Sequence, residues 1–173
     1  MQVRVASLGL RVVAGVLDLA PVSALAAGAT WAWFDRHPPD LPPRYWNVFD
    51  YAVDLVHLRP DAVLVFPVAF AVVFLLWETL WTAALGGAPA ARLLGIRVIT
   101  TSGRRVGLFR SLVRAVLALV LAAAAGIGPA WALVSPRRRM LHDILCACLA
   151  VRGPSMPLSG GIDVDMDALG RGA

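Results

Sequence analysis

The sequence predicts an all-α, polytopic helical membrane protein with two full spans, a third apolar segment broken by Gly and Pro, and a small cytoplasmic cap with short strands. Of the 173 residues, 59% are apolar and only 16% are charged, and the mean hydropathy is +0.73. A soluble domain is about 45 to 50% apolar and about 25% charged, so a soluble enzyme is excluded first. Two apolar runs exceed the roughly 20 residues that a bilayer-spanning helix needs.

The first of these runs extends from about Leu8 to Phe34 and contains Arg11 and Asp18. Small residues around Ala26 resemble the cleavage zone of a signal peptide. The apolar core of a signal peptide is an uninterrupted stretch of about 7 to 15 residues, and Asp18 interrupts this one. We therefore favour a span that is retained.

A polar connection, residues 35 to 61, follows the first span. Four prolines in its first half exclude a regular helix there. The aromatic second half favours an interfacial belt or a short surface helix over a substrate-binding loop, through Tyr45, Trp46, Phe49 and Tyr51. The second span is predicted from about Ala62 to Leu85, and it carries one ionisable residue, Glu78.

The remaining residues are expected to form the cap and a tail. In an arginine-rich loop over residues 86 to 114, the segment from Gly95 to Gly103 is typical of a short strand closed by a turn. The last apolar stretch, residues 115 to 136, is broken between Gly126 and Pro129. A transmembrane domain is thus expected over residues 1–151 and a disordered, acidic and Gly-rich tail over residues 152–173.

The positions of the arginines predict the topology. All 16 basic residues are Arg, and cytoplasmic flanks carry the excess of positive charge. If the last apolar stretch crosses once, eight arginines lie on each side; if it returns as a re-entrant hairpin, thirteen lie on one side and three on the other. We therefore expect a return, in a multi-pass protein of the bacterial inner membrane with a cytoplasmic N-terminus.

The same arginines indicate a partner. Nucleic-acid binding needs basic side chains gathered on one water-exposed face, whereas these flank apolar stretches, so anionic lipid headgroups are expected and nucleic acid is not. The candidate lipid-contacting residues are Arg92, Arg97, Arg104, Arg105, Arg137, Arg138 and Arg139.

Charged residues within spans are functional candidates because they are costly to insert. Asp18 and Glu78 are predicted at similar depths, about 10 and about 12 Å from the cytoplasmic boundary at 1.5 Å per residue. Two acids at one level can bind a cation or proton if they face each other; otherwise Asp18 is a structural counter-ion for an arginine, namely Arg11, Arg110 or Arg114. The ion- or substrate-binding candidates are Asp18, Glu78, Arg11, Asp143, Arg114 and His142.

Metal and catalytic chemistry have little support. Cys146 and Cys148 form a C-x-C beside His142 and Asp143, but structural zinc uses four ligands in paired spacings, so two packed thiols are expected and no metal or other cofactor. Neighbouring residues on a helix do not face each other, so His142 and Asp143 should diverge rather than form a catalytic couple. We expect no enzyme and assign no catalytic residue.

Three motifs occur in order along the chain. Residues 11 to 18 read R-V-V-A-G-V-L-D, residues 89 to 98 read P-A-A-R-L-L-G-I-R-V, and residues 141 to 143 read L-H-D. Over about residues 8 to 151 the chain resembles the RDD family of small bacterial membrane proteins, whose motifs are R-x-x-A-x-x-x-D, T-P-G-K-R-L-L-G-L-R-V and L-H-D.

The resemblance implies transport of unidentified ligands and, for some members, sodium/proton exchange. It also implies that a strand near Val151 pairs with a strand near Val98. The chain departs from the family where Thr, Gly and Lys of the second motif are replaced by Ala88, Ala90 and Ala91. A further departure is Ala147-Cys148 in place of Gly-Thr after the third motif.

Two functions are therefore expected. In the first, the chain is a transport or cation/proton exchange component in which Asp18 and Glu78 bind the ion, and Arg11, Arg114 or Asp143 set their charge state. In the second, it is a structural or accessory membrane protein whose buried charges hold helices together and whose arginines bind anionic lipid. With about 140 residues in the bilayer region, a homo-oligomer or a membrane partner is expected.

Overall fold

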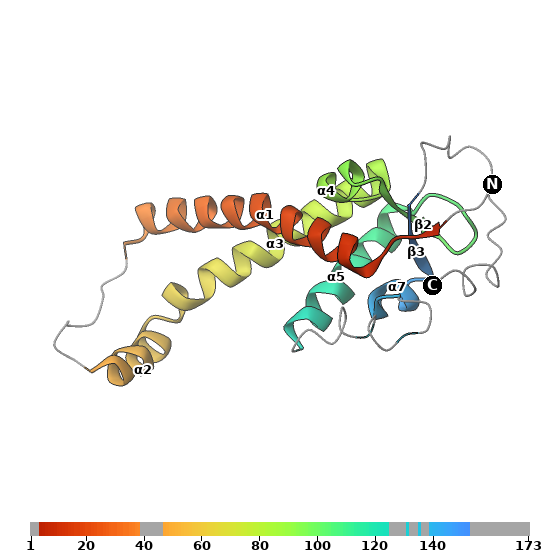
Figure 1. The fold of residues 1–173 in the computed structure, drawn as a ribbon. Helices are drawn as coiled ribbons and strands as arrows, with labels where there is room; N and C mark the ends of the chain where they lie inside the picture. The colour runs from red at the N-terminus through yellow and green to blue at the C-terminus, as the bar shows by residue number, and fades with distance from the viewer. Residues whose placement is uncertain (1–3, 39–46, 125–130, 132–134, 136–138, 153–173) are drawn as a thin grey trace. The chain divides into compact units, whose positions relative to one another are not determined.

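The computed structural model describes residues 4–38, 47–124, 131, 135 and 139–152. Figure 1 shows its elements, which in chain order are β1 (Arg4–Val5), α1 (Leu8–Arg36), α2 (Val48–Leu58), α3 (Pro60–Leu85), α4 (Pro89–Leu93), β2 (Ile96–Thr100), α5 (Leu108–Ala123), α7 (Leu141–Leu145) and β3 (Cys148–Arg152). The chain divides into two compact units. Unit 1 comprises residues 1–19 and 75–173, and unit 2 comprises residues 20–74.

Among the described residues, α1 and α3 are the helices that are long and apolar enough to cross a membrane. They contain 29 and 26 residues, so a helix long enough to span occupies each of the two predicted positions. Pro21 and Pro67 lie within them without ending them, as spanning helices tolerate. Along α3, large apolar side chains are exposed, among them Leu64, Val68, Val72, Leu76 and Leu80. Such exposed apolar side chains are suited to contact with lipid.

In unit 2, α2 is a short helix with an exposed apolar surface. The side chain of Asn47 caps its first turn, because its Oδ1 accepts hydrogen bonds from the amides of Phe49 and Asp50, each at 2.9 Å. Phe49 is 83% exposed. The prediction of a short surface helix in the aromatic stretch is met by α2, whereas Tyr45 and Trp46 lie outside the described residues.

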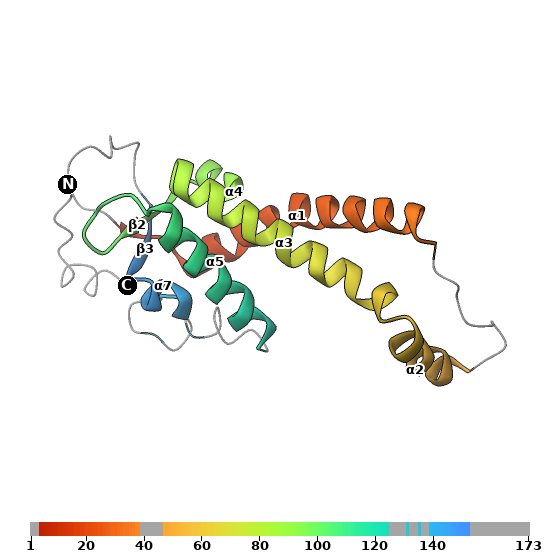
Figure 2. The ribbon, with the colours of Figure 1, turned by 180° about the vertical axis from the view of Figure 1, so that it is seen from behind.

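Unit 1 contains a three-stranded antiparallel sheet in the order β1-β3-β2. Val5 of β1 pairs with Val151 of β3, and on the other side Val98 of β2 pairs with Ala150. The implied pairing of strands near Val98 and Val151 is therefore correct. In both views the sheet lies beside α5 and α7 (Figures 1 and 2), so strands from three distant parts of the chain meet at one place.

The predicted strand with its closing turn is also present. The amide of Thr100 donates to the carbonyl of Arg104 at 2.9 Å, and the turn passes through Gly103 at φ +73°, a left-handed conformation that glycine adopts without steric cost. The turn returns the chain toward α5.

Small buried side chains fill the interior of unit 1 around the sheet. One cluster joins Ala6, Ala14, Ile96 and Ala150, and a second joins Val98, Val106, Cys146 and Cys148. Both cysteines are free and buried, as expected for packed thiols. Burial raises the pKa of the Cys148 thiol to about 11, so it stays protonated and unreactive at neutral pH.

The third apolar segment begins earlier than predicted. α5 starts at Leu108 rather than near residue 115, so Arg110 and Arg114, which were assigned to a loop, lie within a helix. The helix includes them because Arg110 is exposed while Arg114 reaches into the unit. The predicted Gly126–Pro129 break and the tail beyond Arg152 lie outside the described residues.

The end of α7 generates a first prediction. Ala147 has φ +49°, a conformation that costs an L-residue roughly 1–2 kcal/mol. After allowing for the greater freedom of glycine in the unfolded chain, Ala147→Gly should raise the free energy of unfolding by about 0.5–1 kcal/mol. Thermal unfolding of the purified protein in detergent measures this; an unchanged or lower midpoint would contradict the strain.

Candidate functional site

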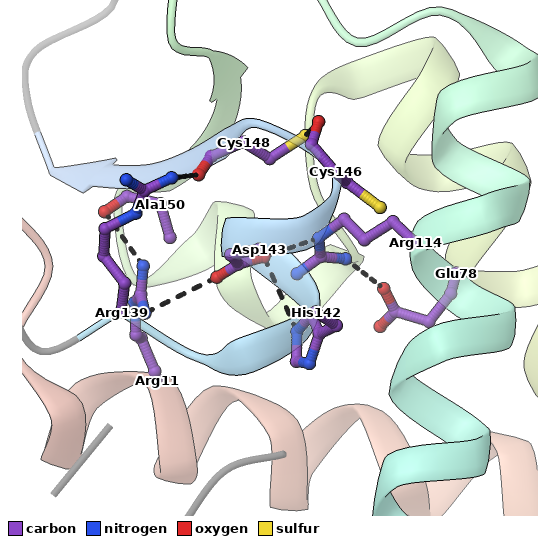
Figure 3. Close-up of polar contacts among 9 residues, drawn as sticks. All are labelled: Arg11, Glu78, Arg114, Arg139, His142, Asp143, Cys146, Cys148 and Ala150. Carbon is purple, nitrogen blue, oxygen red and sulfur yellow. Dashed lines mark hydrogen bonds and ion pairs between the residues drawn. The ribbon is translucent and has the colours of Figure 1, made fainter. Parts of the chain in front are cut away.

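The candidate site is built around Asp143, in the first turn of α7. Its side chain is 1% exposed. Oδ1 accepts a hydrogen bond from Nε of Arg114 on α5 at 2.9 Å, and Oδ2 lies 3.6 Å from Nη1 of Arg11 on α1. Figure 3 shows the carboxylate between these two guanidinium groups. A buried charge is costly unless it is paired, so the two arginines account for its burial.

Arg114 links this carboxylate to a second one. Its Nη1 donates to Oε2 of Glu78 on α3 at 3.1 Å, and its side chain is 12% exposed against 20% for Glu78. Arg11, Asp143, Arg114 and Glu78 therefore form a row of alternating charges (Figure 3). We call these four residues the charge network. It joins α1, α3, α5 and α7 within unit 1.

Two arginines, one of them a member of the charge network, donate hydrogen bonds to the central strand of the sheet. Nη2 of Arg11 donates to the carbonyl of Ala150 at 3.3 Å, and Nη2 of Arg139 donates to the carbonyl of Cys148 at 2.9 Å. Both carbonyls belong to β3. Arg139, which was predicted to contact lipid, is half-buried and its guanidinium is bonded to this strand.

Asp18 has a different partner from the one expected. Its Oδ1 and Oδ2 accept hydrogen bonds from the backbone amides of Ala90 and Ala91, at 3.0 and 3.3 Å. These amides belong to the first turn of α4, whose N-cap residue, Ala88, supplies no side-chain hydrogen bond. Asp18 thus caps α4 from another helix. The prediction of an arginine counter-ion is wrong in the partner, although the acid is buried and paired as required.

His142 departs from its prediction as well. Its Nε2 lies 3.5 Å from Oδ1 of Asp143, so the two adjacent side chains converge rather than diverge. The helix α7 has only five residues, and both side chains turn toward the interior. Burial lowers the pKa of His142 to about 4, so the ring is neutral at pH 7. Burial acts to raise the pKa of Asp143, but Arg114, His142 and Arg11 hold it below its usual range.

The structure therefore brings together five of the six predicted ion-binding candidates. Asp18 and Glu78, which were expected to form a common site if they faced each other, have separate partners. Among the predicted lipid contacts, Arg92 and Arg97 are half-buried, Arg104 and Arg105 are exposed, and Arg137 and Arg138 lie outside the described residues.

Sequence reasoning missed the main-chain partners. The carbonyls of Cys148 and Ala150 and the amides of Ala90 and Ala91 carry no side-chain signature. One signal pointed to the amides: Pro89, which is favoured in the first turn of a helix, follows an alanine that cannot cap it. Among the described residues there is no group of three or more His, Cys, Asp or Glu side chains able to hold a metal ion.

Comparison with models of protein families matches the RDD family over residues 5–147. Searches of curated proteins and of solved structures found no match. All four members of the charge network lie within the matched range, as does Asp18.

The charge network generates a prediction about stability. Asp143→Asn leaves two buried guanidinium groups without their shared carboxylate, and breaking a buried ion pair typically costs about 3–5 kcal/mol. Chemical unfolding in detergent should show a loss of this size. The matched control is Asp61→Asn, because Asp61 forms an exposed pair with Arg59 and such pairs contribute only about 0–1 kcal/mol. Equal losses in the two variants would refute the assignment.

The pKa of His142 gives a pH prediction. Because it is depressed from 6.5 to about 4 in the folded protein, the unfolded chain binds the extra proton between these values. The contribution of His142 to stability should therefore be constant above pH 7 and fall as the pH drops from about 6.5 to 4, by at most about 1.4 kcal/mol per pH unit. In His142→Gln the fall over this interval should be smaller; an identical pH profile would count against a buried neutral histidine.

Proposed function

Because this chain belongs to the RDD family, whose members are membrane proteins, we propose that it is a proton-exchanging component of a membrane transport system. Glu78 is the exchanging carboxylate in this proposal. The observation that carries it is the bridge of Arg114 between Glu78 and Asp143, at 3.1 and 2.9 Å. An ionisable residue within a span is by default a functional candidate.

Glu78 differs from the other two acids in its partners and in its exposure. Both oxygens of Asp18 accept hydrogen bonds, and Asp143 lies between two guanidinium groups. Glu78 is bonded through Oε2 to Arg114, and its side chain is 20% exposed. It is therefore the acid that can change its charge with least disturbance of the fold, since Arg114 retains Asp143 as a counter-ion.

The geometry favours a proton over a metal cation. A metal ion bound to Glu78 would lie close to the Arg114 guanidinium, and like charges near 4 Å repel by about 4 kcal/mol at an effective dielectric constant of 20. Protonation removes the negative charge of Glu78 without bringing a second positive ion beside the arginine. A cation-coupled activity is the result that would replace this assignment.

The sheet supports the topology that the arginines predict. β1 precedes α1, β2 follows α3, and both strands pair with β3. If α1 and α3 each cross the bilayer, β1 and β2 lie on the same side, and β3 must lie there too. The stretch between β2 and β3 then begins and ends on that side. We infer that the apolar segment of residues 115–136 returns, with the N-terminus in the cytoplasm by the arginine excess.

A structural function is the second candidate, and the capping of α4 by Asp18 favours it. This contact holds α4 against α1 and needs no change of charge. In our proposal the two roles are divided between the acids: Asp18 maintains the fold, and Glu78 exchanges a proton.

Reconstituted vesicles test this division. Glu78→Gln should abolish pH-driven exchange, measured with a pH-sensitive dye inside the vesicles, while lowering the thermal midpoint by less than Asp18→Asn does. Asp18→Asn keeps one acceptor oxygen of the cap and loses the other, so it should destabilise the fold by about 1 kcal/mol, lower the thermal midpoint, and retain exchange in proportion to the folded fraction.

The expected outcomes separate the two functions. Equal loss of folding and exchange in Glu78→Gln would favour the structural function. Exchange that depends on an added alkali cation, with no proton movement in its absence, would show that the ion is not the proton alone. Asp61→Asn serves as the matched control because it removes an acid that is paired at the surface.

A further inference from the structure

Several buried polar side chains of unit 1 have no hydrogen-bond partner among the residues that the structure describes. Three of them lie on different helices: the hydroxyls of Thr82 on α3 and Ser111 on α5, and Nδ1 of His142 on α7. Their residues are 1%, 1% and 6% exposed. Buried polar groups in native proteins are almost always hydrogen-bonded, to protein or to ordered water, so these three need an explanation.

The two hydroxyls also differ from an ordinary helical threonine. Hydroxyls within a helix commonly donate to the carbonyl four residues earlier, as Thr30 does to Ala26 at 2.8 Å. Thr82 and Ser111 make no such bond. Their hydroxyls therefore remain available to a ligand.

Each of the three side chains is close in sequence to a residue of the charge network. Thr82 lies one helical turn after Glu78 on α3, so the two share a face. Ser111 lies one turn before Arg114 on α5. His142 is next to Asp143, and Figure 3 shows its ring beside the Arg114 bridge. Each unpartnered group is thus within one turn of a different member of the network.

We propose that ordered water binds at Thr82, Ser111 and His142 around the Arg114 bridge, and that Glu78 gains and loses its proton through this water. Buried water typically makes about three hydrogen bonds to otherwise unsatisfied buried polar groups, and each of these three side chains provides one such group. The second half of the proposal rests on the proposed function; the first half does not.

Water is the ligand that fits the chemistry. A hydroxyl and a neutral imidazole can each donate or accept a hydrogen bond, and water can do both. A metal ion would be repelled by the positive charge of the Arg114 guanidinium. Among the described residues, the charged groups that act on Glu78 include Arg114 from α5, Asp143 from α7 and Asp18 from α1. Because Glu78 lies in an apolar span, hydration from inside unit 1 gives its proton a path that avoids lipid.

The first half is tested by magnetisation transfer from water to the His142 ring, in protein labelled at histidine, with His37→Gln and His57→Gln used to assign the signals. We expect transfer to His142 in the parent protein and at least a threefold reduction in Ser111→Ala. Absence of transfer in the parent would overturn the proposal.

Thermal unfolding is a second test: Thr82→Val should lower the midpoint and Thr82→Ser should preserve it. A higher midpoint in Thr82→Val would show a dry, unsatisfied hydroxyl.

The second half is tested by infrared spectroscopy of the Glu78 carboxyl band, identified by its loss in Glu78→Gln. Hydrogen–deuterium exchange of this carboxyl should slow at least tenfold in the Thr82→Val, Ser111→Ala double variant. Thr30→Val is the matched control, because its hydroxyl is bonded within its own helix, and it should leave the rate unchanged. An unchanged rate in the double variant would overturn the path through water. If Glu78 shows no protonation band at any pH, the proposed function fails, while the transfer to His142 still decides the hydration.

Discussion

The pairing of one buried carboxylate with two arginines is the interaction on which unit 1 depends. Removing a charge from water costs several kcal/mol even after relaxation, and Asp143 is tolerated in the interior because Arg11 and Arg114 approach it from separate helices. Neither arginine is close to Asp143 in sequence. The carboxylate can therefore be accommodated only when α1, α5 and α7 are assembled, which makes the assembly selective for one arrangement.

Unit 1 stabilises its acids by two different means. Asp143 is neutralised by full positive charges, whereas Asp18 accepts hydrogen bonds from the amides of a helix end, where the backbone carries only partial charge. The amide cap is fixed by the geometry of α4 and cannot follow a change in protonation. The guanidinium of Arg114 carries several donors and contacts two acids, so it keeps one acid as a counter-ion when the other is protonated. This difference is why we place exchange at Glu78 and structural support at Asp18.

Much of the fold could be predicted from the sequence, because it depends on local patterns. Long apolar runs define α1 and α3, and the Gly95 to Gly103 segment predicts β2 with its turn. The polar contacts depended instead on tertiary structure. The partners of Asp18 are main-chain amides, and the partner of Arg139 is a main-chain carbonyl. Nothing in the sequence marks which of these backbone groups receives a side chain. The length of α7 decides whether His142 and Asp143 converge, and a five-residue helix has no periodic signal.

The order of strands in the sheet has a consequence for biogenesis. β3 occupies the middle of the sheet, yet among the described strands it is the last to leave the ribosome. Until it emerges, β1 and β2 lack the strand that lies between them, so α1 and α3 are synthesised while the sheet is still open. Closure of the sheet is then a late step with high contact order, and a chaperone or membrane protease meeting the nascent protein would find the strand edges accessible until β3 has left the ribosome.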